Sequence, residues 1–147
     1  MLDVNLESLN ALNSDSLLKS IEIGKHGHRS AGPKGQYRFA RALQYIADNL
    51  EAGVSTKDLA SLENLSVYHF SRLFKRSMGV TPYAYVINVR IARARKLLLE
   101  TVLPISDIAY AVGFSSQSHM TTTMKNLAGH TPGQFRRNSA LQSVRDM

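Results

Sequence analysis

Two stretches of this chain repeat one pattern. Residues 58–82 read DLASLENLSVYHFSRLFKRSMGVTP, and residues 107–132 read DIAYAVGFSSQSHMTTTMKNLAGHTP. Six residues recur, the first two at an offset of 49 residues and the other four at 50, so one residue is inserted between them. The recurring pairs are Asp58/Asp107, Ala60/Ala109, Lys75/Lys125, Gly79/Gly129, Thr81/Thr131 and Pro82/Pro132. A repeat of this length predicts two copies of one supersecondary unit.

Each copy predicts two helices around a short turn, which is the layout of a helix-turn-helix. In the first copy, the apolar spacing favours a short helix over 56–63 and a longer one over 67–78. The second copy favours helices over 105–112 and 116–127, with Gly113 at the turn, where a left-handed backbone is easy. A hydroxyl residue can cap the longer helix in both copies. The predicted fold class is therefore all-α.

The flanking sequence predicts how the copies are joined. Four glycines and a proline between residues 24 and 35 are typical of a linker. Pro82 can start a long helix that runs to about Glu100, since proline suits a first helical position. A last short helix is expected to end near Arg137. The expected parts are an N-terminal, partly flexible extension over 1–35, a first helix-turn-helix subdomain over 36–80, a linker helix over 81–100, a second subdomain over 101–137 and a C-terminal tail over 138–147.

The charge of the chain suits a polyanionic partner. The net charge is +7 and the computed pI is about 9.9. Residues 1–36 sum to zero, so residues 37–147 carry the whole excess. Many soluble proteins are equally basic, and charge alone leaves the question open. Together with two helix-turn-helix units, it predicts a reader of double-stranded DNA.

Composition excludes several other functions. The chain has no cysteine, so it has no disulfide, no thiolate metal site and no cysteine nucleophile. No run approaches the ~18 apolar residues of a membrane span. His26 and His28 are a weak metal signal within the linker, and the histidines show no acidic partner. We expect no enzyme activity, no cofactor, no metal, no membrane association, and a cytoplasmic location on the nucleoid.

The order of motifs resembles a known family. The chain is similar to the DNA-binding domain of the AraC/XylS family of bacterial transcription regulators over about residues 38–137. The matching segments are Asp58-Leu59-Ala60, Ser66 to Lys75, Gly79-Val80-Thr81-Pro82, Arg90-Ile91, Ile105 to Ala109, Val112-Gly113-Phe114 and Gly129 to Arg136. The resemblance implies seven helices in two homeodomain-like subdomains, bridged by the long central helix. It also implies two recognition helices that enter successive major grooves of one duplex.

This resemblance implies a sequence-specific transcription regulator, which we expect to be an activator. We expect a monomer on promoter or operator DNA that recruits RNA polymerase. One alternative is the DNA-binding fragment of a longer, ligand-sensing regulator. Another is a helical adaptor that binds proteins and shows no salt-dependent affinity for DNA.

Seven outward residues on the two recognition helices are expected to read bases. Arg72 is the first of them, because arginine can bond a guanine edge with two parallel hydrogen bonds. Its other possible roles are a surface ion pair or a phosphate contact, and Tyr68 could instead pack half-buried. The base-reading set is Tyr68, Ser71, Arg72, Gln117, Ser118, Thr121 and Thr122. The expected phosphate contacts are Ser66, His69, Lys75, Arg76, Ser116, His119 and Lys125.

The second copy departs from the family pattern. Thr122 occupies a position where family members commonly have arginine, and Met124 replaces the aromatic Phe74 of the first copy. We therefore expect the second recognition helix to add affinity with less selectivity, and its half of the domain to pack more loosely. Arg90 is expected to hold the central helix, while Arg136 and Arg137 are expected to touch phosphates or nothing.

Overall fold

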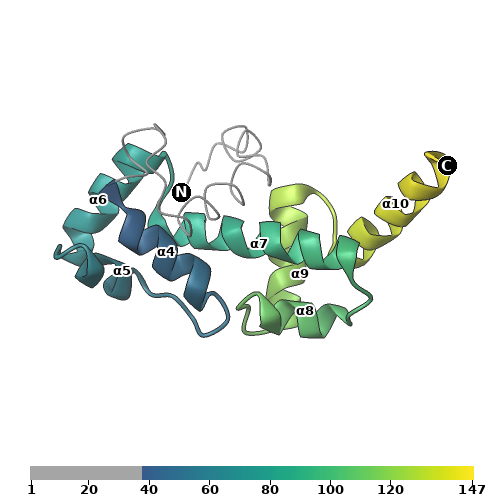
Figure 1. Cartoon of the computed structure of the whole chain (residues 1–147), viewed down its shortest axis with the longest axis horizontal. Helices are drawn as coiled ribbons and strands as arrows, with labels where there is room; N and C mark the ends of the chain where they lie inside the picture. The colour runs from purple at the N-terminus through teal and green to yellow at the C-terminus, as the bar shows by residue number, and fades with distance from the viewer. Residues whose placement is uncertain (1–37) are drawn as a thin grey trace. The chain divides into compact units, whose positions relative to one another are not determined.

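The computed structural model describes residues 38–147, and this part of the chain is all-helical (Figure 1). The seven helices are α4 (Ala40–Asn49), α5 (Thr56–Leu62), α6 (Val67–Met78), α7 (Pro82–Glu100), α8 (Ile105–Ala111), α9 (Gln117–Ala128) and α10 (Pro132–Arg145). The predicted fold class is confirmed. The expected extension over 1–35, its glycine-rich linker and the two histidines within it lie outside the described residues.

The last helix is longer than predicted. α10 continues to Arg145, so the expected end near Arg137 was wrong. Its start is fixed by a capping box, in which the Thr131 hydroxyl accepts from the Gln134 backbone N–H at 3.2 Å and the Gln134 side chain accepts from the Thr131 N–H at 3.0 Å. No glycine or proline follows Gly133, and the segment includes good helix formers such as alanine, leucine and glutamine, so nothing ends the helix earlier.

The described chain divides into two compact units, with the boundary between Val89 and Arg90. This boundary falls inside α7, so each unit contains one helix-turn-helix and part of the long helix. The finer division into subdomains and a separate linker helix stays a prediction. Within residues 38–147, no helix is both long and apolar enough to cross a membrane.

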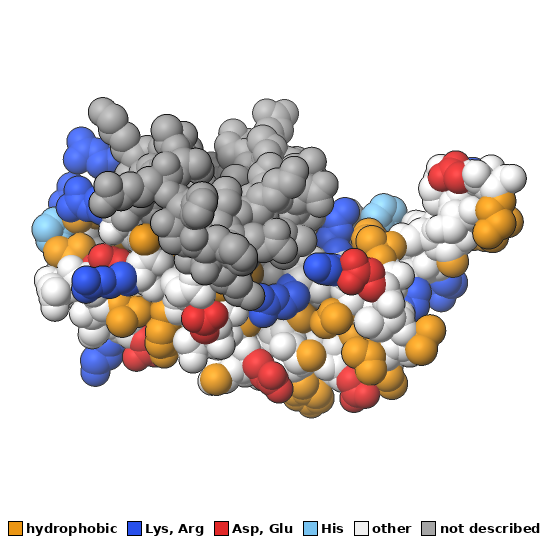
Figure 2. All heavy atoms as spheres, viewed as in Figure 1, with side chains coloured by type: hydrophobic (Ala, Val, Ile, Leu, Met, Phe, Trp, Pro, Cys, Tyr) orange, Lys and Arg blue, Asp and Glu red, His pale blue; other side chains and the backbone are white. Residues whose placement is uncertain are grey.

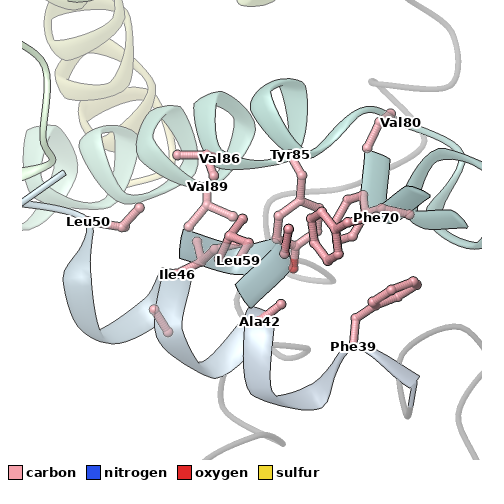
Figure 3. Packing of buried hydrophobic residues seen from close by; sticks show 13 residues of the cluster. Phe39, Ala42, Ile46, Leu50, Leu59, Phe70, Val80, Tyr85, Val86 and Val89 are labelled. Carbon is pink, nitrogen blue, oxygen red and sulfur yellow. The ribbon is translucent and has the colours of Figure 1, made fainter. Parts of the chain in front are cut away.

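An aromatic cluster forms the core of the first unit. The Phe74 ring lies 5.3 Å from Phe39, 5.5 Å from Phe70 and 5.6 Å from Tyr85, measured between ring centroids. Figure 3 shows side chains from α4 and α7 converging on this core. Burial raises the pKa of the Tyr85 hydroxyl to about 12. The ring contacts and the buried area together fix α6 against the rest of the unit.

A carboxylate that lies 21 residues later in the sequence caps the start of α4. The Glu63 Oε1 atom accepts a hydrogen bond from the Ala42 backbone N–H at 3.2 Å. Ala42 lies in the first turn of α4, where the cap residue Phe39 offers no side-chain acceptor. Glu63 thus satisfies a backbone donor that the helix itself leaves unpaired.

Methionines replace the aromatic pair in the second unit. Met120 and Met124 are fully buried at the positions that Phe70 and Phe74 occupy in the first copy. Ile108, Val112 and Phe114 are buried in the same unit. The apolar positions of the repeat are therefore conserved between the copies, while the expected looser packing stays a prediction.

The turns of the two copies explain the inserted residue. Asn64 has a φ of 56° and Gly113 a φ of 96°, so both turns place one residue in the left-handed region. The next residue then donates back to the short helix, from Leu65 N to Ala60 O at 3.0 Å and from Phe114 N to Ala109 O at 2.9 Å. Through Leu65 and Phe114 the two copies match at an offset of 49 residues. Ser115 is then inserted before Ser116, the cap residue that corresponds to Ser66.

Candidate nucleic-acid interface

The first recognition helix, α6, is fixed at both ends. The Ser66 hydroxyl accepts from the His69 backbone N–H at 3.1 Å, and Gly79 ends the helix in the left-handed conformation, with a φ of 82°. Phe70 and Phe74 anchor its inner side in the core. The caps and the buried rings together determine which side chains face solvent.

The outer side of α6 carries an aromatic and basic pair. Tyr68 is 71% exposed, so the alternative of half-buried packing does not hold. Arg72 Nη1 donates to the Tyr68 hydroxyl at 3.5 Å, and its Cζ atom lies 5.6 Å from the centre of the Tyr68 ring. Ser71, which is half-buried, lies beside them. Since residues four apart share a helix face, Tyr68 can hold the guanidinium over the outer surface.

Basic side chains surround this pair. His69, Arg72, Lys75 and Arg76, together with Leu73, line a hollow in the surface of the first unit. Figure 2 shows Lys and Arg side chains gathered over α6. The helix contains no acidic residue, so its outer face presents no negative charge to a partner.

The second recognition helix, α9, has the same caps. The Ser116 hydroxyl accepts from the His119 backbone N–H at 3.1 Å, and Gly129 ends the helix with a φ of 80°. Met120 and Met124 point into the core. The predicted start and end of this recognition helix are thus confirmed to within one residue.

The outer face of α9 is small and nearly uncharged. Gln117, Ser118 and Thr122 are exposed, while Thr121 is half-buried. Lys125 is the single lysine or arginine of the helix. His119 is exposed, and its ring also lies 5.1 Å from the Phe114 ring at a near-perpendicular angle, which orients it against the turn.

Arg136 has an internal role that the sequence did not reveal. Its guanidinium donates to three backbone carbonyls, those of Leu98 at 3.3 Å, Thr101 at 3.3 Å and Leu103 at 2.8 Å. These carbonyls belong to the end of α7 and the loop before α8. The expectation that Arg136 touches phosphates or nothing is corrected in one respect, because Arg136 holds this loop through three hydrogen bonds. A phosphate contact by its remaining N–H groups stays a prediction.

Two more arginines of the second unit lie over aromatic rings. The Cζ atom of Arg90 is 5.9 Å from the Phe114 ring centre, and that of Arg95 is 5.0 Å from Phe135. Arg90 thus connects α7 to the turn of the second helix-turn-helix, in keeping with the structural role expected for it. In residues 38–147, no three side chains of the metal-binding types converge on one point.

Comparison with known proteins places this geometry in a family. A family profile described as a helix-turn-helix domain matches residues 59–138. The chain is similar to the crystal structure of a Chromobacterium violaceum transcriptional regulator, one of the AraC-type DNA-binding domain-containing proteins. The two sequences are 34% identical. The match covers 74% of this chain and 97% of that chain, with a TM-score of 0.67. The chain belongs to the AraC/XylS family.

The curated relatives of this AraC/XylS protein are longer. LumQ of Photobacterium leiognathi, a probable transcriptional regulator, is 36% identical over 62% of this chain and 37% of LumQ. AdaA of Bacillus subtilis, a bifunctional transcriptional activator and DNA repair enzyme, is 34% identical over 69% of this chain and 48% of AdaA. The chain therefore spans less than half the length of either relative. It contains a DNA-binding helix-turn-helix region of an AraC/XylS transcription regulator.

Proposed function

We propose that this chain binds a specific double-stranded DNA site with α6 and α9 and thereby regulates transcription. One observation carries the proposal. Both helices have the same cap, two buried apolar anchors at the same positions and an exposed outer face without acidic residues. A helix held in this way can enter a major groove, where each base pair presents its own pattern of donors and acceptors.

In the first half-site, α6 supplies the charged contacts. We assign base reading to Tyr68, Ser71 and Arg72, because Arg72 carries the parallel donors that match guanine O6 and N7. Four side chains beside them would contact phosphates and set the register of the helix. They are Ser66, His69, Lys75 and Arg76.

In the second half-site, α9 supplies mainly hydroxyl groups. Its base-reading residues are Gln117, Ser118, Thr121 and Thr122, and its phosphate contacts are Ser116, His119 and Lys125. Ser66 and Ser116 also cap their own helices, where each hydroxyl oxygen accepts from a backbone N–H. The hydroxyl hydrogen of each serine stays available to donate to a phosphate.

One chain would occupy both half-sites. α7 is continuous over 19 residues, which corresponds to ~28 Å of helix. The half-sites of helix-turn-helix dimers are ~34 Å apart, or one turn of DNA. A single chain with two such helices could then bind as a monomer at a site that other proteins bind as dimers.

The regulatory outcome we infer is activation in the cytoplasm, by recruitment of RNA polymerase to a nearby promoter. AdaA combines activation with DNA repair. Repair by transfer of an alkyl group to a thiolate needs a cysteine, and these 147 residues contain none. We therefore assign this chain a binding function and no catalytic one.

Selection of bound duplexes from random DNA at physiological salt tests the proposal. The expected product is a bipartite site whose halves lie about ten base pairs apart, centre to centre. The affinity for DNA should fall steeply as the salt concentration rises. Binding of the protein releases cations from the DNA phosphates, and this release becomes less favourable when the solution already contains more salt. A chain without salt-dependent DNA binding would instead support the protein-binding adaptor.

A further inference from the structure

The two recognition helices present different chemistry on one scaffold. We infer that α6 reads a half-site with a required guanine, whereas α9 reads a half-site made of A·T pairs. This inference rests on the proposed function, and it adds the base composition and polarity of the DNA site.

The scaffold makes the outward positions of the two helices equivalent. Both have a serine cap with a 3.1 Å bond to the third helical N–H, and both end at a left-handed glycine that donates to a lysine carbonyl at 2.9 Å. Their inner anchors are buried at the same spacing. The equivalent outward pairs are Val67/Gln117, Tyr68/Ser118, Ser71/Thr121, Arg72/Thr122, Lys75/Lys125 and Arg76/Asn126.

Several expected phosphate contacts are the same in both copies. The serine cap, the following histidine and the lysine of the third turn recur at the same positions. Phosphate contacts fix the register of a helix in the groove but carry no sequence information. With these contacts shared, the helices differ mainly at the positions that face bases.

At those positions α6 favours guanine. The Arg72 guanidinium lies against the Tyr68 ring, with a 3.5 Å bond to its hydroxyl, so part of its conformational freedom is already lost before binding. Guanine presents two acceptors in the major groove, N7 and O6, that match an arginine fork.

At the same positions α9 favours A·T pairs. Thr122 stands in place of Arg72 and Ser118 in place of Tyr68, so the fork and the ring are both lost. Gln117 is exposed and can bond adenine N6 and N7, while a threonine methyl can contact the methyl group of thymine. These contacts distinguish A·T from G·C without a positive charge.

Three arginines of the second unit make contacts within that unit and do not replace the one that α9 lacks. Arg90 and Arg95 lie over the rings of Phe114 and Phe135, and Arg136 bonds backbone carbonyls. All three are on α7 or α10 rather than α9. These three arginines therefore hold the second unit together, and none of them stands at the position on α9 that matches Arg72.

The test compares the sites selected by the full chain and three variants. The unaltered chain should return one half with a fixed guanine and one half of A·T pairs. Arg72→Ala should relax the guanine and leave the A·T half unchanged. Thr122→Arg should gain about tenfold or more in affinity for a site with guanine placed in the A·T half. Asn126→Arg is the matched control, because it adds the same charge to α9 and should strengthen binding to all sequences alike.

The outcomes separate this inference from the proposed function. A bipartite site with guanine required in both halves overturns the inference and leaves DNA reading intact. A second half without any base preference overturns it as well. Loss of DNA binding by the unaltered chain, in contrast, overturns the proposed function itself.

Discussion

The two helix-turn-helix copies share their helix caps and their expected phosphate contacts, and they differ in the side chains of the core and of the base-facing surface. The first has a core of interlocking aromatic rings and an outer face with Tyr68 and Arg72. The second has methionines in the core and hydroxyl groups outside. The comparison indicates that caps, turn residues and apolar spacing specify the scaffold, while the side chains of the core and of the outer face can both change on it.

The largest expected difference between the copies is in core stability. Phe74→Ala should lower the free energy of unfolding by about 3–5 kcal/mol, because it removes contacts with three rings and leaves a cavity. Met124→Ala, the matched change, should cost less, toward the lower end of about 2–5 kcal/mol. Urea denaturation followed by circular dichroism measures both. Equal costs would show that the two cores are packed alike.

The next largest effect concerns the three hydrogen bonds that Arg136 donates to backbone carbonyls in the second unit. Arg136→Ala should lower the free energy of unfolding by about 2 kcal/mol, because three carbonyls lose a charged donor. Arg137→Ala is the control, since this exposed neighbour has no described bond and should change stability by less than about 0.5 kcal/mol. Thermal unfolding distinguishes the two. A stable Arg136 variant would mean that the loop before α8 holds its shape unaided.

DNA reading provides a third contrast. Arg72→Ala should cost about 1–3 kcal/mol of binding free energy on a selected site and relax one base position. Thr122→Ala should cost less, because a hydroxyl and a methyl group discriminate less sharply than a guanidinium fork. Titration of a labelled DNA duplex with each variant measures the two losses of binding free energy. Greater loss from the threonine change would reverse the assigned order of the helices.

The smallest effect is one that the copies should share. Lys75→Ala and Lys125→Ala should each reduce the slope of log affinity against log salt by about one unit, without altering base preference. Binding at several salt concentrations gives the slope. A changed base preference with a constant slope would show that the lysine reads bases instead.

Local signals made most of the scaffold predictable. The two ends of α6 and the start of α7 follow from Ser66, Gly79 and Pro82, which act on their own helix ends. The end of α10 was missed because no comparable stop signal exists beyond Gly133, and composition alone did not show that the helix continues.

Contacts between distant residues were not predictable in the same way. Arg136 bonds carbonyls that lie 33 to 38 residues earlier, and Glu63 caps a helix 21 residues away. Their side chains resemble ordinary surface charges in the sequence. The repeat could not help either, because Arg136 and Glu63 correspond to Val86 and Val112. The position of a residue on a predicted helix was thus enough to choose the candidate site residues. The contacts between side chains required the structure.

The buried hydroxyl of Tyr85 offers an optical signal for the first unit alone. Its pKa is raised to about 12 in the folded chain, so the stability this group contributes is present below its unfolded pKa near 10 and is lost as the pH rises toward 12. Its counterpart in the second copy is Phe135, which does not ionise. Because the chain has no tryptophan, tyrosinate absorbance in alkaline solution is free of indole signal. The chain has six tyrosines, so the part of the rise that is lost in Tyr85→Phe would time the opening of the first unit without any attached dye.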